Sequence, residues 1–308
     1  MHDEAATFVS TATAPGAPTG GLLTGQRWLV VGAKGMLGQD LVDLARAAGA
    51  EVNPLDLPEI DITDPVSVNN AINGRGYNVI VNCAAWTAVD DAEGKEGIAF
   101  TVNAVGPANL ARAAKANHAR LVQISTDYVF PGDAVEPYSE ISTVSPKGAY
   151  GRTKAAGEWA VSANTDDYLI IRTAWLYGAG GPNFPKTMAK LAASRDVLTV
   201  VDDQKGQPTW TRDLADLIIR SIAAEAPSGI YHGTSGGAVT WNEFAKEIMN
   251  SIGSNTRVDP VSSAAFAAKA PRPAFSVLDH SALRNINVEP IGDWRERWQK
   301  AAPIVLAQ

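Results

Sequence analysis

The sequence predicts a doubly wound α/β fold, with helices on both faces of a parallel sheet and a smaller, discontinuous α/β lobe. Three observations support it. Short strand segments that are apolar throughout are typical of a sheet buried on both faces. Helical segments alternate with these strands, which favours parallel pairing through right-handed crossovers. A glycine-rich turn directly follows the first strand.

The expected elements follow from hydrophobic pattern and helix-end signals. Strands are predicted at residues 27–31, 51–55, 79–82, 120–125 and from 168. Helices are predicted at 36–48, from 65, and at 99–116, 150–162, 184–193, 211–224 and 241–252. Glycine and proline cluster at residues 178–185 and 270–273, so we expect the smaller lobe to be built from several segments.

Composition and charge are those of an ordinary globular protein. The chain has 308 residues and a formal net charge of −7, which argues against a dedicated surface for nucleic acid or anionic membrane. Cys83 is the only cysteine, so no intramolecular disulfide can form and a reducing cytosol is expected. The four histidines lack zinc-ligand spacing. Neither a signal-peptide pattern nor a run of ~20 apolar residues occurs, which favours a cytoplasmic protein.

A glycine loop made of Gly32, Gly35 and Gly38 lies between the first strand and the first helix. The first glycine permits a tight turn, the second lets the backbone approach a pyrophosphate, and the third lets helix and strand pack closely. The N-terminus of the helix adds free N–H groups for phosphate. The loop therefore indicates a dinucleotide cofactor, with tight-turn packing as the alternative.

Asp56, at the end of the second strand, bears on the choice of cofactor. A carboxylate at this place can bind an adenosine ribose and favours NADH, and no arginine lies nearby to hold a 2′-phosphate. The same side chain could equally cap the loop that follows. The choice between NADPH and NADH stays open.

Tyr150 and Lys154 stand four residues apart at the start of a predicted helix, so both project from one face. A nearby ammonium stabilises the phenolate and lowers the tyrosine pKa from about 10. The tyrosine can then exchange a proton with a carbonyl oxygen during hydride transfer, while the lysine can also hold the nicotinamide ribose. Downstream of a glycine loop, the pair predicts a nicotinamide-dependent oxidoreductase. Alone, it could be a solvated helix face.

A third catalytic group is expected at the carboxyl end of the fourth strand, beside the nicotinamide. Ser125 and Thr126 lie there, and a hydroxyl at this point can hydrogen-bond the substrate oxygen. The residues alone do not decide between the two, and either hydroxyl could merely cap the strand.

Several longer motifs resemble one family. They are NCAAWTAVDDAE (82–93), STDYVF (125–130), YGRTKAAGE (150–158), RTAWLYG (172–178) and DDQKGQPT (202–209). With the glycine loop, they resemble the dTDP-4-dehydrorhamnose reductase family of extended short-chain dehydrogenases over about residues 27–300. The resemblance implies a Rossmann-type fold. It also implies reduction of the 4-keto group of dTDP-4-dehydrorhamnose to dTDP-L-rhamnose with NADPH or NADH, the last step of dTDP-L-rhamnose biosynthesis.

The resemblance also assigns roles to residues. It implies that Thr126, rather than Ser125, acts with Tyr150 and Lys154. The residues expected to bind the cofactor, from the loop and the resemblance together, are Gly32, Gly35, Met36, Leu37, Gly38, Asp56, Asp61, Ile62, Ala84, Ala85, Trp86, Thr87, Asn103, Tyr150 and Lys154. The residues expected to bind the substrate are Thr126, Asp127, Trp175, Asn183, Lys186 and Arg272.

Some residues assigned to substrate binding could instead have only a structural role or lie on the solvated surface. Trp175 could stack on thymine or sugar, or be a core tryptophan. A diphosphate needs cations, which Lys186 and Arg272 could supply, but both could equally be solvated surface residues. Asn183 is a similarly weak candidate.

We expect the chain to consist of a tail, a cofactor-binding domain and a substrate-binding lobe. Residues 1–26, rich in Ala, Thr, Gly and Pro, are predicted to be a disordered tail or the end of a linker from a longer fused protein. Residues 27–177, with about 209–232, are predicted to form the NAD(P)-binding domain. Residues of about 178–208 and 233–308 are predicted to form the substrate-binding lobe.

Two departures from the family affect cofactor packing and metal binding. Trp86 stands where some relatives have histidine. Some relatives bind Mg²⁺ through acids at a dimer interface, and here Asp40 keeps an acid whereas Arg212 places a cation that would repel the metal. We therefore predict no metal, and a monomer or weak dimer that is not bridged by Mg²⁺.

Other functions and partners remain open. The chain could reduce or epimerise another nucleotide sugar, or be a non-catalytic NADP-binding regulatory subunit of the same fold. It could be fused to, or associated with, the epimerase of the preceding step. Neither nucleic acid nor membrane is an expected partner.

Overall fold

The structure is a computed structural model that describes residues 20–265 and 268–307. Within them lies a six-stranded parallel sheet with the order β10-β5-β4-β3-β1-β2. Its strands are β1 (Arg27–Val31), β2 (Glu51–Leu55), β3 (Val79–Asn82), β4 (Arg120–Thr126), β5 (Tyr168–Thr173) and β10 (Gly229–His232). The predicted doubly wound fold is confirmed.

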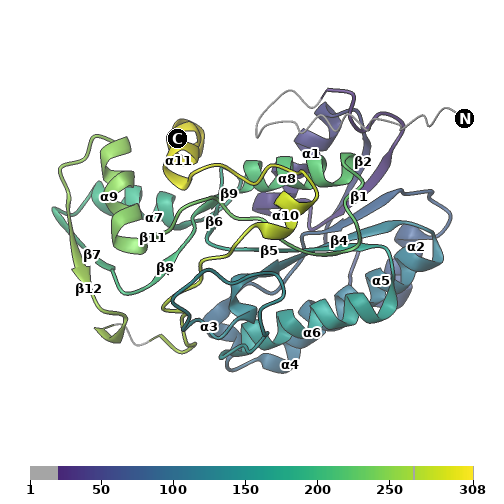
Figure 1. Cartoon of the computed structure of the whole chain (residues 1–308), viewed down its shortest axis with the longest axis horizontal. Helices are drawn as coiled ribbons and strands as arrows, with labels where there is room; N and C mark the ends of the chain where they lie inside the picture. Colours follow the sequence, from purple (N-terminus) through teal and green to yellow (C-terminus); the bar gives the residue numbers. More distant parts are fainter. Residues whose placement is uncertain (1–19, 266–267, 308) are drawn as a thin grey trace, which may run out of the picture.

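Helices cover both faces of this sheet (Figure 1). On one face, Trp28 and Val30 of β1 share a core with α1 (Met36–Ala47) and α8 (Thr211–Ala223). On the other face, Leu29 and Val31 share a core with helices that include α2, α5 and α6. Alternate residues of a strand point to opposite faces, so a strand that is apolar throughout needs both layers. The helices of the second layer are α2 (Pro65–Ile72), α5 (Gly106–Ala116) and α6 (Ala149–Asn164).

The helix predicted at 99–116 is interrupted in the structure. It consists of α4 (Glu96–Phe100), the π-helical turn η1 (Thr101–Val105) and α5. The turn is held by Asn103, whose side chain hydrogen-bonds both the N–H and the C=O of Trp86. A π turn leaves no mark in the hydrophobic period, so this interruption could not be read from the sequence. Its effect is to fix the segment that follows β3.

The smaller lobe has a core of its own, which includes Tyr177, Phe244 and Trp298. Three short two-stranded sheets support it: β6 with β9, β7 with β12, and β8 with β11. The strands are β6 (Leu176–Tyr177), β7 (Val197–Val201), β8 (Lys205–Gly206), β9 (Thr209–Trp210), β11 (Val239–Thr240) and β12 (Arg257–Val261). Its helices are α7 (Phe184–Ala192), α9 (Trp241–Ser251) and α11 (Trp294–Val305). The remaining short elements are α3 (Val89–Ala92), η2 (Asp127–Val129), η3 (Ser263–Ala265) and α10 (Ser281–Asn285).

The segment limits differ from the prediction at two places. Leu23 is fully buried and its N–H donates to the carbonyl of Ala48 at 2.9 Å, so residues 20–26 belong to the fold rather than to a tail. The tail predicted for residues 1–19 lies outside the described residues. Leu283 of α10 packs into the sheet core, so part of 233–308 returns from the lobe to the first domain.

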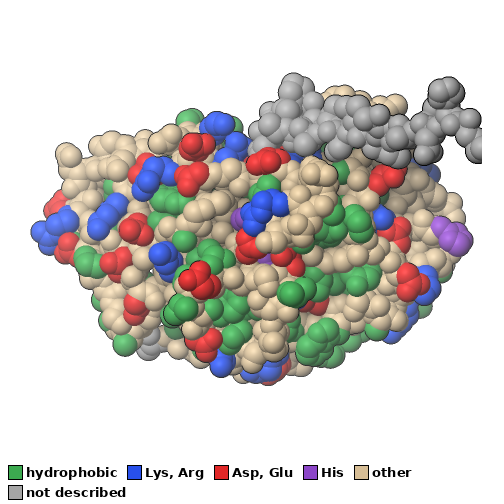
Figure 2. Space-filling view, viewed as in Figure 1, with side chains coloured by type: hydrophobic (Ala, Val, Ile, Leu, Met, Phe, Trp, Pro, Cys, Tyr) green, Lys and Arg blue, Asp and Glu red, His purple; other side chains and the backbone are tan. Residues whose placement is uncertain are grey.

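No helix in the described part of the chain is both long and apolar enough to cross a membrane. On the face shown in Figure 2, acidic and basic side chains are interspersed among hydrophobic and polar ones. That face presents no broad field of a single charge.

Candidate active site

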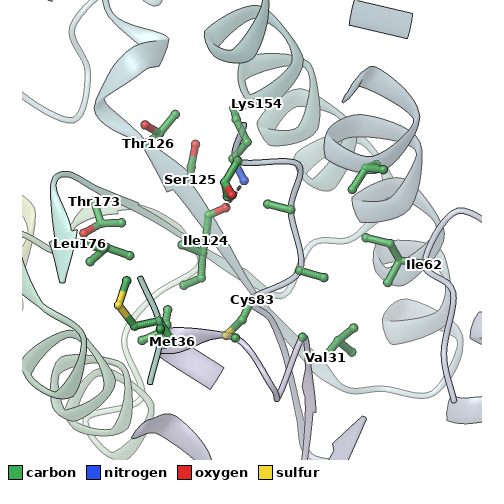
Figure 3. Close-up of a pocket in the computed structure, with 18 of the residues that line it drawn as sticks. Val31, Met36, Ile62, Cys83, Ile124, Ser125, Thr126, Lys154, Thr173 and Leu176 are labelled. Atoms are coloured by element: carbon green, nitrogen blue, oxygen red, sulfur yellow. Dashed lines mark hydrogen bonds between the residues drawn. The ribbon is translucent and has the colours of Figure 1, made fainter. Parts of the chain in front are cut away.

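A cavity of about 870 Å³ opens at the carboxyl ends of the central strands, lined by residues that include Val31, Cys83 and Ile124 (Figure 3). β1 and β3 are neighbours there, although β2 lies between them in sequence. In doubly wound sheets, ligands bind outside the carboxyl ends of strands at such a switch point. The cavity also falls in the size range of small-molecule sites.

The glycine loop forms the cavity floor at the end of β1. Gly32 has a φ of 76°, and a Cβ there would lie 2.6 Å from the amide nitrogen of Ala84. A Cβ at Gly38 would overlap the carbonyl oxygen of Gly32, so this glycine allows the close packing of helix and turn. Gly38 does not line the cavity, whereas Gly32 and Gly35 do.

The start of α1 fits a dinucleotide pyrophosphate. Gly35 precedes the helix with no side-chain cap within the described structure, and Met36 and Leu37 line the cavity. The first N–H groups of a helix have no partner within the helix and carry partial positive charge. A Cβ at Gly35 would also lie only 3.1 Å from the carbonyl of Gly32 on a wall of the cavity. The loop and helix therefore suit NADPH or NADH.

Asp56 is tied to the glycine loop. Its carboxylate accepts hydrogen bonds from the N–H of Lys34 and of Leu57, both at 2.9 Å. Asp56 and Lys34 both line the cavity, and the Lys34 ammonium lies 3.6 Å from Glu59. Asp56 therefore caps the loop, which was the alternative to ribose binding. The sequence places no arginine here, but Lys34 places a cation on this side of the cavity, where its ammonium donates to the carbonyl of Leu57 at 3.2 Å.

The other expected cofactor contacts divide into two groups. The residues that line the cavity are Asp61, Ile62, Ala84, Ala85 and Thr87. Trp86 and Asn103 do not line it. The side chain of Asn103 is used by the backbone of Trp86 and by Thr153, and the Trp86 indole packs near Ala149 and Tyr150. Because Asn103 holds the backbone of Trp86, its action on a ligand is indirect.

Tyr150 and Lys154 of α6 both line the cavity, as their spacing predicts. Lys154 is buried, and its ammonium donates to the carbonyl oxygen of Ile124 at 2.6 Å (Figure 3). Burial lowers the pKa of Lys154 to about 8, and Glu158 opposes this shift. An ammonium has three donors, so two remain after the bond to Ile124.

The pKa of Tyr150 differs from the expectation. Burial raises it to about 12, a hydrogen bond with Thr126 opposes the rise, and Asp127 adds to it. Lys154 is not among the groups that shift the pKa of Tyr150 in this structure, so the expected lowering is not seen there. At neutral pH the phenol is therefore protonated, which is the form that can donate a proton.

Thr126 and Asp127 complete a hydroxyl network. The Thr126 hydroxyl donates to Asp127 Oδ1 at 2.9 Å and accepts the N–H of Tyr128 at 3.2 Å, and it acts to lower the pKa of the neighbouring Tyr150. Burial raises the pKa of Asp127 to about 6, with hydrogen bonds from Ser276 and Thr126 acting against the rise. All three side chains line the cavity. Tyr150, Thr126 and Asp127 thus lie together on one wall of the cavity.

Ser125 has a different partner. Its hydroxyl donates to Glu158 Oε1 at 2.5 Å, and Arg172 makes a bidentate contact with the same carboxylate at 2.9 and 2.7 Å. This buried ion pair uses the Ser125 hydroxyl, which leaves Thr126 as the hydroxyl beside Tyr150. The geometry therefore favours Thr126 over Ser125 as the third group.

The residues expected to bind substrate lie in separate places. Trp175 lines the cavity, whereas Asn183, Lys186 and Arg272 do not. Asn183 caps α7 and donates to the carbonyls of Gly178 and Gly181, while the Lys186 ammonium donates to Ala179. Asn183 and Lys186 therefore shape the 178–183 loop, whose Gly180 and Gly181 line the cavity.

Arg272 borders a second cavity of about 800 Å³ in the smaller lobe. Its guanidinium pairs with Asp90 at 2.8 Å. Arg195, Gln204 and Trp241 also line this cavity, and Tyr128 lines both cavities. The two hollows are therefore neighbours on either side of Tyr128.

Sequence reasoning missed several cavity residues. Ile124 contributes a backbone carbonyl, which no motif signals. Thr173, at the end of β5, has a buried hydroxyl without a hydrogen-bond partner among the described residues and lines the first cavity. Its position inside RTAWLYG was the available signal. The lobe residues Arg195 and Trp241 carried none.

The acid expected at a bridging metal site is engaged elsewhere. Asp40 accepts a hydrogen bond from Thr211 at 2.5 Å. Burial raises its pKa, with Thr211 and Arg212 acting in the opposite direction. The described residues contain no group of three or more His, Cys, Asp or Glu side chains that could hold a metal. Whether the protein binds a metal stays a prediction.

A family model described as the RmlD substrate binding domain matches residues 26–305. The chain belongs to this family. It is 48% identical over 283 residues to the dTDP-4-dehydrorhamnose reductase of Streptomyces griseus, covering 90% of this chain and 93% of that protein. It is 44% identical to the dTDP-4-keto-6-deoxy-D-glucose reductase of Streptomyces niveus, covering 91% and 98%.

Solved structures also resemble this RmlD-family chain. The dTDP-4-dehydrorhamnose reductase of Bacillus anthracis, solved in complex with NADP, is 37% identical, with a TM-score of 0.87 and coverage of 90% of this chain and 98% of that chain. The family resemblance predicted from the motifs is confirmed.

Proposed function

We propose that this protein reduces the 4-keto group of dTDP-4-dehydrorhamnose to dTDP-L-rhamnose with NADPH or NADH. The observation that carries the proposal is the Tyr150, Thr126 and Asp127 network beside buried Lys154, in the cavity that the glycine loop borders. The names of the relatives in Streptomyces griseus and Bacillus anthracis support the substrate.

The residues of the chain supply the proton for this reduction. A bound reduced nicotinamide supplies the hydride that the keto carbon receives. The Tyr150 phenol gives its proton to the keto oxygen, so the product is a hydroxyl and Tyr150 is left as a phenolate. Lys154 stabilises that phenolate, because a nearby cation favours the charged form. The single O–H of Thr126 turns from Asp127 to the keto oxygen in this step. Thr126 also orients the keto oxygen.

The proposed substrate spans both cavities. Its keto sugar lies in the first cavity beside Tyr150, and its nucleotide lies in the second. Arg272 and Arg195 border the second cavity, and a diphosphate favours guanidinium donors. Arg272 is already paired with Asp90, so phosphate binding there would share or replace that ion pair.

A second candidate is a reductase of another dTDP-4-keto sugar. The Streptomyces niveus relative, named for dTDP-4-keto-6-deoxy-D-glucose, favours it, because that relative is nearly as similar as the first. Both candidates use the same proton path and differ in the stereochemistry of the sugar.

A panel of dTDP-4-keto sugars distinguishes them. Turnover is followed by loss of NADPH or NADH absorbance, and products are compared with authentic dTDP-L-rhamnose. We expect the highest kcat/KM with dTDP-4-dehydrorhamnose and without any added protein. Turnover of another keto sugar alone would favour the second candidate. A need for a partner protein, or binding without turnover, would favour the regulatory-subunit alternative.

The proposal extends to location and assembly. We propose a cytoplasmic enzyme whose partner is its dTDP-sugar substrate, acting as a monomer or as a weak dimer without a metal bridge. Association with the epimerase of the preceding step remains a proposal, which co-purification from cells would test.

A further inference from the structure

Two tryptophans from distant parts of the chain stack between the two cavities. The rings of Trp175 and Trp241 have centroids 3.5 Å apart and planes within 7°. Trp175 lines the first cavity and Trp241 the second. Since Trp241 covers one face of the Trp175 indole, the remainder of that indole borders the first cavity. The stacked pair of tryptophans therefore forms a wall between the first cavity and the second.

The backbone and a glycine also hold Trp175. Its φ is 46°, in the left-handed region that bulky residues rarely occupy. A Cβ at Gly206 would lie only 2.5 Å from Cε2 of the Trp175 ring. The glycine of the DDQKGQPT motif thus makes room for the indole edge. Strained backbone persists only where surrounding contacts impose it, and such sites cluster where ligands bind.

The same motif anchors Trp241. Thr240 caps α9, and its hydroxyl donates to Asp202 Oδ1 at 2.6 Å. Gly206 pairs with Val239 in the β8 and β11 ladder, two residues before Trp241 (Figure 1). Phe184 packs against the Trp241 ring at 4.6 Å between centroids. One short segment therefore fixes both partners of the stack.

We propose that Trp241 is a positioning residue, which holds Trp175 so that the keto sugar is aligned with Tyr150. This inference rests on the proposed function. Trp241 acts through the stack, so its loss lets the Trp175 indole move and misaligns the sugar. Misplacement of a substrate by about 1 Å can lower a rate by about 100-fold.

The test compares kcat for the keto sugar with the Kd of dTDP and of NADPH, each measured by calorimetric titration. Trp241→Ala removes the stacking partner, and Trp241→Phe keeps an aromatic one. Gly206→Ala presses on the same indole from its edge. Trp159→Ala is the matched control, because Trp159 is 61% exposed on α6, away from both cavities.

We expect Trp241→Ala and Gly206→Ala to lower kcat by about 10- to 100-fold, with little change in either Kd. Trp241→Phe should restore most of the rate, and Trp159→Ala should match wild type. The inference is overturned if Trp241→Ala weakens dTDP binding at unchanged kcat, which makes Trp241 a nucleotide contact. It is also overturned if Gly206→Ala and Trp241→Ala keep the full kcat.

Folding and the proposed function are checked separately. Thermal denaturation identifies a variant that does not fold, and Gly206→Ala with Trp241→Phe then decides the question. A wild-type protein that turns over none of the keto sugars contradicts the proposed function. Only variants of an active wild type can contradict the positioning role.

Discussion

Proton positions in the first cavity depend on burial. The same desolvation keeps Tyr150 protonated, brings the pKa of Lys154 down to about 8 and raises that of Asp127 to about 6. The carboxylate of Asp127 fixes the Thr126 hydroxyl, and the Lys154 ammonium stabilises the phenolate left after proton donation. The reactive protonation state therefore occupies a limited pH range.

The pH dependence of kcat/KM should follow from these two groups. Asp127 becomes a carboxylate as pH rises through about 6, and Lys154 loses its ammonium as pH rises through about 8. We expect a bell-shaped dependence of kcat/KM on pH, with its plateau between these two pKa values. Asp127→Asn should abolish the acidic limb and lower the plateau. An acidic limb that persists in Asp127→Asn would assign it to another group.

Lys34 should contribute to the choice of cofactor. Its backbone N–H donates to Asp56, the carboxylate expected at the adenosine ribose, and its ammonium donates to the carbonyl of the neighbouring Leu57. NADPH carries its 2′-phosphate on that ribose. We expect Lys34→Ala to raise the Kd for NADPH about 10-fold, the effect of roughly 1.4 kcal/mol, and to leave the Kd for NADH nearly unchanged. Lys246→Ala, an exposed lysine on α9, is the control. An equal increase in the Kd for NADPH and in the Kd for NADH would contradict this role.

At the level of single elements, the π turn η1 positions the loop after β3. Asn103 accepts the Trp86 N–H at 2.8 Å and donates to its carbonyl at 3.1 Å. A Cβ at Gly157 of α6 would overlap the carbonyl of Asn103, so α6 and the turn are in direct contact. The turn thereby connects the helix of Tyr150 with the loop that carries Ala85 and Thr87.

Asn103→Ala should weaken both stability and cofactor binding. It leaves the Trp86 N–H without its acceptor, which costs about 1–3 kcal/mol of unfolding free energy. Asn70→Ala, on the exposed face of α2, should change neither property. Chemical denaturation and NADPH titration measure the two effects. Unchanged NADPH affinity in a destabilised Asn103→Ala protein would show that the turn serves the fold alone.

The helices and strands that the sequence predicted are those in which apolar residues follow a clear pattern. β1 is apolar at every position after Arg27, and the apolar residues Leu214, Leu217, Ile218 and Ile222 of α8 recur at helical spacing, so both elements were placed to within a residue or two. Two-residue strands such as β8 and β11 have no measurable period, and their pairing joins residues far apart in sequence. The glycine loop, Tyr150 and Lys154 were found by spacing. Thr173, Lys34 and Trp241 required the fold, because only the fold brings them to a cavity wall.

Over the whole molecule, the site lies where two cores meet. The sheet and its helices carry the first cavity, and the lobe around Phe244 carries the second. Leu283 and its neighbours return from the lobe to the sheet core, and β6 pairs with β9 at the junction. These connections join the two cavities into one structural unit.

Both ligands should therefore stabilise the folded protein. Each ligand at 100 times its Kd is expected to raise the unfolding free energy by about 2.7 kcal/mol. NADPH and dTDP occupy different cavities in this account. The increases in unfolding free energy that the two ligands cause, measured by thermal unfolding, should therefore add. If dTDP gives no increment once NADPH is bound, the two ligands compete for one cavity.

The central claim is that Tyr150 donates the proton to a dTDP-4-keto sugar. Single-turnover reduction of dTDP-4-dehydrorhamnose by Tyr150→Phe, with NADPH and dTDP affinities measured alongside, tests it most directly. The account predicts a loss of about 10²- to 10⁴-fold in rate, with binding of both ligands preserved. A Tyr150→Phe protein that reduces the keto sugar at the wild-type rate would contradict it.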